Sequence, residues 1–115
     1  MDEAGYRRGL ELFNQGEFFE AHEVLEDVWR AAPAGEKKFL QGLIQVAVGL
    51  HHHSRGNLEG ARSLLARANR NLSGYGSRHG EIDLAGLRGQ VELWVNALEE
   101  GGAAPELPSI EVHRG

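Results

Sequence analysis

The sequence contains no cysteine and only 3 prolines in 115 residues. A chain without cysteine has neither a disulfide framework nor a thiol nucleophile. It also has no apolar run that could cross a bilayer, because the longest, residues 39–50, has roughly a dozen residues against the ~20 that a spanning helix needs. The first residues, MDEAGYRRGLELF, show no basic segment followed by an apolar stretch and do not resemble a signal peptide. These absences predict a cytoplasmic protein with no membrane association.

Several catalytic and cofactor motifs are absent as well. No serine stands in a G-x-S-x-G elbow, and the phosphate-binding patterns GxGxxG and GxxxxGKS/T do not occur. The net charge of −5 opposes binding to phosphate backbones, and the aromatic residues fall mostly at core positions rather than among the arginines. We therefore expect no cofactor and no nucleic-acid partner.

Charge is unevenly distributed along the chain. Acidic residues crowd the early part and arginines crowd the middle, at Glu17, Glu20, Glu23, Glu26 and Asp27 and at Arg55, Arg62, Arg67, Arg70 and Arg78. The simplest interpretation is that these residues form the solvated faces of two amphipathic helices, which would attract each other if they packed together. The alternative is a basic strip that binds a partner.

Apolar residues recur at helical spacing in two segments near the N-terminus. Tyr6, Leu10 and Phe13 form one face of a helix predicted over residues 3–15, which Asp2 caps and Gly16 ends. A second helix is predicted over residues 17–32 and is closed by Pro33 and Gly35. Its apolar face consists of Phe18, Ala21, Leu25, Val28, Trp29 and Ala32.

A third helix is predicted over residues 36–55, and it is apolar nearly all round, so it belongs at the centre of the fold. Its Gly42 and Gly49 lie on one face, where a neighbouring helix can approach closely. A fourth helix follows Asn57 and runs to residue 72. After a loop, a fifth helix begins at Asp83 and stops at the glycines 101 and 102.

The expected architecture is a single-domain, all-α bundle of about five helices that begins with antiparallel hairpins. The helical domain is predicted over residues 1–102 and a C-terminal tail over residues 103–115. A weak repeat at an offset of forty residues relates the segments that start at Gly16 and Gly56, and each resembles the second helix of a tetratricopeptide repeat. The apolar third helix, together with Leu107, Ile110 and Val112 in the tail, favours a homodimer.

Polar residues interrupt the margins of two helices that must bury most of their surface: His22, Glu26, Gln41, Gln45 and His52. His22 and Glu26 are one turn apart, and the other three form a narrow stripe on the third helix. If the second and third helices form an antiparallel hairpin, we expect one contiguous cluster, with His52 near Phe18 and His22. Such a cluster is either a ligand pocket or a buried network that fixes helix register.

A metal site is a further interpretation of the same residues. Imidazole and carboxylate groups together bind zinc or iron, and His22, Glu26 and His52 are the candidates. The spacing is not diagnostic, because HExxH is absent and adjacent histidines of the triplet at 51–53 point about 100° apart on a helix. We therefore assign no metal from the sequence.

Two stretches resemble a known family. FNQGEFFEAHEVLEDVWR and KKFLQGLIQVAVGLHHHSRGNLEGARSLLARA carry, in order, the segments H-E-x-L-E-x-x-W, Q-G-x-I-Q and G-N-x-x-G-A, and are similar to the bacterial and archaeal family called domain of unknown function 309. The resemblance implies a helical protein of unassigned function. It places the family's polar and aromatic signature on Glu20, His22, Glu23, Glu26, Trp29, Gln41, Gln45, a histidine of the triplet, which His52 fits best, and Gly56 and Asn57.

Together these features predict a non-enzymatic helical module that binds a peptide, a protein or a small ligand. The alternative is a small, metal-dependent enzyme that uses the same residues. The candidate pocket comprises Glu20, His22, Glu23, Glu26, Trp29, Gln41, Gln45 and His52.

Overall fold

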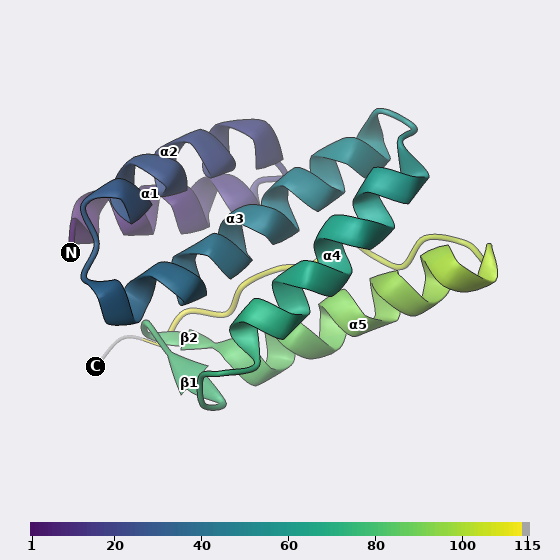
Figure 1. Cartoon of the computed structure of the whole chain (residues 1–115). Helices are drawn as coiled ribbons and strands as arrows, with labels where there is room; N and C mark the ends of the chain where they lie inside the picture. The colour runs from purple at the N-terminus through teal and green to yellow at the C-terminus, as the bar shows by residue number, and fades with distance from the viewer. Residues whose placement is uncertain (114–115) are drawn as a thin grey trace.

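The structure, a computed structural model, describes residues 1–113 and confirms the all-α bundle (Figure 1). Its helices are α1 (Glu3–Asn14), α2 (Phe18–Arg30), α3 (Ala34–Ser54), α4 (Leu58–Leu72) and α5 (Leu84–Glu100). Consecutive helices from α1 to α4 run antiparallel, and α3 packs against α2 on one edge and α4 on the other. The prediction of an antiparallel start and a central third helix is therefore confirmed.

Helix boundaries follow local capping chemistry. Asp2, Asn57 and Asp83 each accept a hydrogen bond from the backbone N–H three residues later, at 2.9 Å in every case. These side chains satisfy backbone donors that the first turn of a helix leaves free. The N-termini of α1, α4 and α5 are thus fixed where the sequence predicts them, whereas Pro33, expected to close the second helix, is the N-cap of α3.

Glycines on α3 allow α4 to pack unusually close. A Cβ on Gly42 would lie 2.6 Å from Leu72 Cδ2, and one on Gly49 would lie 3.0 Å from Leu65 Cδ2. Real Cβ atoms almost never approach neighbours under 3.0 Å. The predicted close approach of a neighbouring helix is confirmed, and that neighbour is α4.

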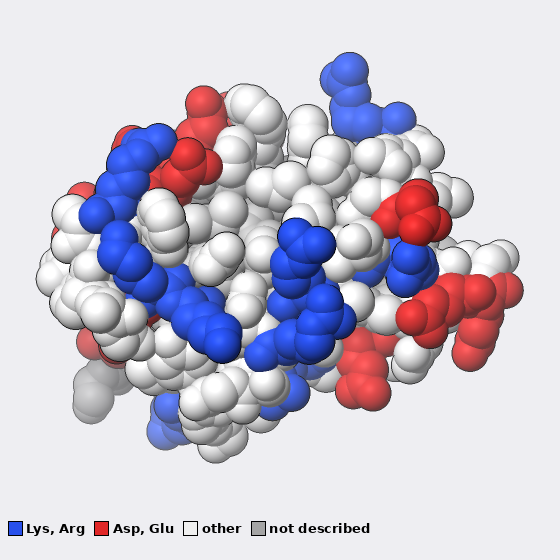
Figure 2. Space-filling model, in the orientation of Figure 1, with Lys and Arg blue, Asp and Glu red and all other residues white. Residues whose placement is uncertain are grey.

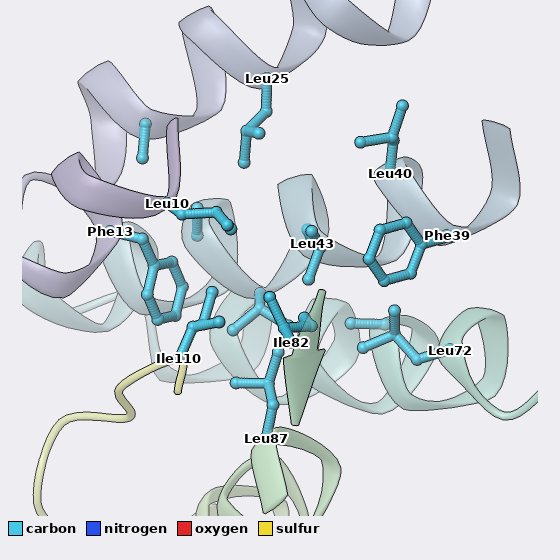
Figure 3. Close-up of a cluster of buried hydrophobic side chains, with 14 of the residues drawn as sticks. Leu10, Phe13, Leu25, Phe39, Leu40, Leu43, Leu72, Ile82, Leu87 and Ile110 are labelled. Atoms are coloured by element: carbon cyan, nitrogen blue, oxygen red, sulfur yellow. The ribbon is translucent and has the colours of Figure 1, made fainter. Parts of the chain in front are cut away.

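The hydrophobic core collects side chains from every helix around α3 (Figure 3). Leu10 and Phe13 come from α1, Leu25 from α2, and Phe39 and Leu43 from α3, all 2% exposed or less. Ile82 and Ile110, which belong to no helix, point into the same cluster. The core is therefore completed by irregular segments as well as by helices.

A short hairpin, which the sequence pattern does not predict, connects α4 to α5. Its strands are β1 (Arg78–His79) and β2 (Ile82–Asp83), joined by a turn in which Gly80 and Glu81 both have positive φ. Two residues per strand are too few to show the alternation that identifies a strand in sequence. The hairpin is attached to the helices by tertiary contacts, because Tyr6 donates its hydroxyl hydrogen to Gly80 O at 2.7 Å.

His79 makes the hairpin's closest polar contact with α3. Its Nε2 lies 2.8 Å from a carboxylate oxygen of Glu36, and its ring packs against Phe39 and Tyr75 at centroid distances of 4.6 and 4.5 Å. Burial and nearby carboxylates, Glu36 first among them, raise the pKa of Tyr6 at the same junction. The hairpin therefore closes one end of the bundle.

The segment after α5, expected as a tail, runs back along the bundle in an extended conformation (Figure 1). Asn14 both donates to Ile110 O and accepts from Ile110 N, at 2.9 and 2.7 Å. Further hydrogen bonds join Trp94 to Glu106, Gln90 to Ser109, Asp83 to Glu111 and Glu81 to His113. Ile110 is consequently buried within the chain, while Leu107 and Val112 stay exposed. Residues 114–115 of the predicted tail lie outside the described residues.

Within residues 1–113, no helix combines the length and the apolar character needed to traverse a membrane.

The α3–α4 contact generates a stability prediction. We expect Gly42→Ala to lower the free energy of unfolding by about 1–3 kcal/mol in urea denaturation, because the added methyl group overlaps the fully buried Leu72. Gly89→Ala on α5 is the matched control, since its Cβ meets nothing within 4 Å, and should raise the free energy of unfolding by up to about 1 kcal/mol. Equal stabilisation of both variants would contradict the close packing.

Candidate functional site

The edge of α2 that faces α3 carries an aromatic and imidazole cluster. Phe19 and His22 lie one turn apart, with ring centroids 5.0 Å apart, and the Phe19 ring also packs against His51 of α3 at 5.2 Å. Phe19 is nevertheless 51% exposed. The second histidine at this place is therefore His51, and the prediction of His52 near Phe18 and His22 is wrong.

The angle between successive residues of a helix explains why His51, rather than His52, packs against Phe19. Adjacent residues of a helix differ by about 100° in direction, so His52 is directed away from the side of α3 on which His51 packs against Phe19. His52 turns toward the α3–α4 connection, where its Nδ1 lies 3.5 Å from Asn57 Nδ2. His53 turns to α5 and packs edge-on against Trp94 at 4.8 Å.

His22 is held in one orientation by the backbone of its own helix. Its Nδ1 lies 2.8 Å from Phe19 O, and since a carbonyl only accepts, Nδ1 carries the hydrogen. The other nitrogen, Nε2, lies 3.6 Å from Glu26 Oε2. Neutral His22 therefore presents an acceptor nitrogen, and protonated His22 an ion pair, toward Glu26.

Next to this pair the surface is hollowed into an acidic depression of about 200 Å³, lined by His22, Glu23, Glu26, Asp27 and Arg30. We call these five residues the α2 acidic site. Arg30 donates to Glu26 at 2.9 Å and also pairs with Asp27. The depression is thus lined by three carboxylates and one guanidinium, which leaves negative charge in excess. Glu20 is exposed on the same helix but does not line the depression.

Trp29 lies at the C-terminal end of α2, where Lys37 of α3 contacts it. Lys37 of α3 donates to Trp29 O and Arg30 O at 2.7 and 3.1 Å, and its Nζ lies 4.3 Å from the Trp29 ring centroid. Lysine thereby satisfies carbonyls that the last turn of a helix leaves free and interacts favourably with the negative end of its dipole. The indole Nε1 of Trp29 is buried without a hydrogen-bond partner among the described residues.

The glutamines belong to the opposite edge of α3. Gln45 is buried and accepts a hydrogen bond from Asn71 of α4 at 2.7 Å, whereas Gln41 is exposed. No hydrogen bond within residues 1–113 joins either glutamine to His22 or Glu26. The expected single cluster is thus divided between the α2–α3 edge, the α3–α4 seam and the end of α3. Asn71 carries no sequence motif, and only its helical register beside Gln45 would have indicated it.

The candidate metal ligands are separated in the same way. Among residues 1–113, no group of three or more histidine, aspartate or glutamate side chains is arranged to hold a metal ion. His22 and Glu26 pair with each other, while His52 contacts Asn57.

Comparison with known proteins gives one family match. Residues 6–64 match the family described as "Domain of unknown function (DUF309)", a range that contains the whole α2 acidic site. The uncharacterized protein YpuF of Bacillus subtilis is 39% identical over 79 residues, which are 68% of this chain and 44% of that protein. An uncharacterized protein of Aquifex aeolicus is 33% identical over 96 residues, 83% of this chain and 28% of that protein. The chain spans less than half the length of these curated relatives.

The Gln45–Asn71 contact predicts a double-mutant cycle. Asn71→Leu alone should lower the free energy of unfolding by about 1–2 kcal/mol, because Gln45 Oε1 loses its donor. Adding Gln45→Leu should recover most of that loss, since an apolar pair leaves no buried group unsatisfied. Exposed Gln41→Leu, the control, should change stability by less than about 0.5 kcal/mol in urea denaturation. Simple additivity of the two substitutions would contradict the coupling.

Proposed function

The chain belongs to the DUF309 family, whose function is unassigned, and from the surface of α2 we propose that it is a protein-interaction module. The binding surface consists of Phe19 and the α2 acidic site. Its partner is a protein segment in which a lysine or arginine stands next to an apolar side chain.

The exposure of Phe19 carries the proposal. The other phenylalanines, Phe13, Phe18 and Phe39, are buried, at 1%, 7% and 0% exposed. Phe19 is instead held at the surface by contacts with two imidazole rings, His22 and His51. An exposed aromatic side chain with restricted freedom is typical of the residues that dominate binding energy in protein interfaces.

Charge supplies the second part of the recognition. The α2 acidic site has three carboxylates, and the contacts of Arg30 with Glu26 and Asp27 support the proposal that these carboxylates can accept hydrogen bonds from a guanidinium. Glu23 makes no ion pair with any of residues 1–113. A cationic side chain of the partner therefore finds an unpaired carboxylate beside an apolar contact, and charge-assisted hydrogen bonds fix its position.

The proposal predicts the outcome of a selection from random displayed dodecapeptides. Peptides selected on the wild-type protein should combine lysine or arginine with a nearby aromatic or aliphatic residue. Phe19→Ser should weaken the binding of these peptides by about tenfold or more, because truncating an anchor residue typically costs over 1.4 kcal/mol. Isothermal titration with the synthesised peptides measures the change.

Leu93→Ser is the matched control, because Leu93 is 60% exposed on α5 and should not affect binding. Glu23→Gln should weaken binding less than Phe19→Ser and should reduce its dependence on salt. Selected peptides that bind Phe19→Ser as tightly as the wild type, or that lack basic residues, would overturn the proposal.

A further inference from the structure

The edge of α3 that packs against α4 carries exposed positive charge, in contrast to the α2 acidic site. Figure 2 shows lysine and arginine side chains in two bands, one over the end of α2 and the beginning of α3, the other over α4, with uncharged atoms between them. The exposed lysine and arginine side chains of α3 and α4 are Lys38 on α3 and Arg67 and Arg70 on α4. None of these three pairs with an acid among residues 1–113.

This lack of pairing is informative in an acidic chain. The sequence has 17 acidic residues against 12 lysines and arginines, so it contains enough acids to pair with every lysine and arginine. The ion pairs of α2 and α4 instead connect residues three or four apart on one helix. The expected attraction between the early acids and the middle arginines therefore forms no ion pair within the described chain, and the cations of the seam remain available.

Amide groups lie between the cations. Asn71 donates to Gln45 Oε1 at 2.7 Å, which leaves the N–H groups of Gln45 Nε2 without a protein acceptor among residues 1–113. Gln41 is exposed one turn before Gln45, and Arg67 precedes Asn71 by one turn on α4. The seam thus offers hydrogen-bond donors and acceptors along its middle and positive charges along its sides.

We propose that this seam, made of Lys38, Gln41, Gln45, Arg67, Arg70 and Asn71, binds an extended acidic segment of a partner protein. Successive side chains of an extended peptide point to opposite sides. Carboxylates can then reach Lys38 on one side and the arginines of α4 on the other, while the peptide backbone lies over the amides. Amide side chains both donate and accept, as a peptide backbone requires.

The same residues favour a peptide over a nucleic acid. Single-stranded nucleic acid is bound by basic grooves that also provide aromatic rings for base stacking. Phe19, which is 51% exposed, lies on the other edge of α3, against His22 and His51. Phosphate groups, which only accept hydrogen bonds, would use the amide N–H groups but not the amide oxygens.

Fluorescence anisotropy with a labelled peptide of five Glu–Ser repeats tests the proposal at low salt. The wild-type protein should bind this peptide and not its Gln–Ser counterpart. The double variant Arg67→Glu and Arg70→Glu should weaken binding by about tenfold or more, because removing cations from a complementary surface removes their attraction and adds repulsion. Gln41→Ala should weaken it about two- to fivefold without changing the dependence on salt.

The double variant Arg8→Glu and Arg55→Glu is the control. Both arginines are exposed and pair with no acid among residues 1–113, and these substitutions change the net charge as much as the α4 substitutions do. The control variant should weaken binding by less than about threefold. Circular dichroism of each variant checks that the helices are retained. Equal weakening by both double variants would show an effect of overall charge and overturn the proposal, as would an absence of binding at low salt. Tighter binding of a DNA or RNA oligomer of equal charge, lost in the α4 variant, would assign the seam to phosphate instead.

Discussion

The close packing of α4 against α3 is the constraint on which the rest of the structure depends. Gly42 and Gly49 bring the backbone of α3 against Leu72 and Leu65, and a larger side chain at either position would separate the two helices. Because α3 also packs against α2, it becomes the common wall of two helix pairs. The same close approach places Asn71 within hydrogen-bonding distance of Gln45 and so creates the seam.

Two non-helical segments complete the hydrophobic core. The hairpin contributes Ile82 to the core, and the segment after α5 contributes Ile110. Each of these extended segments needs partners for its backbone groups, which side chains of Asn14 and Gln90 and the backbone of the neighbouring strand supply. The described residues after α5, up to His113, are thereby attached to both α1 and α5.

The two edges of α3 give the molecule two surfaces of opposite character. One edge combines an exposed aromatic ring with carboxylates, and the other combines amides with cations that pair with no acid among residues 1–113. The ion pairs on α2 and α4 connect residues of one helix, so they do not join the two surfaces. The family match over residues 6–64 includes the aromatic and acidic surface and Gln45, but ends before Arg67, Arg70 and Asn71.

Local physics determined most of the secondary structure. The spacing of apolar residues and the caps Asp2, Asn57 and Asp83 act within one or two turns, so the five helices and the central place of α3 could be predicted from the sequence alone. The choice of His51 over His52, the pairing of Gln45 with Asn71 and the exposure of Phe19 depend on how helices rotate against each other. Packing between residues far apart in the chain decides that rotation, and it also decides the two-residue strands and the burial of Ile110. These features are therefore visible only in the tertiary structure.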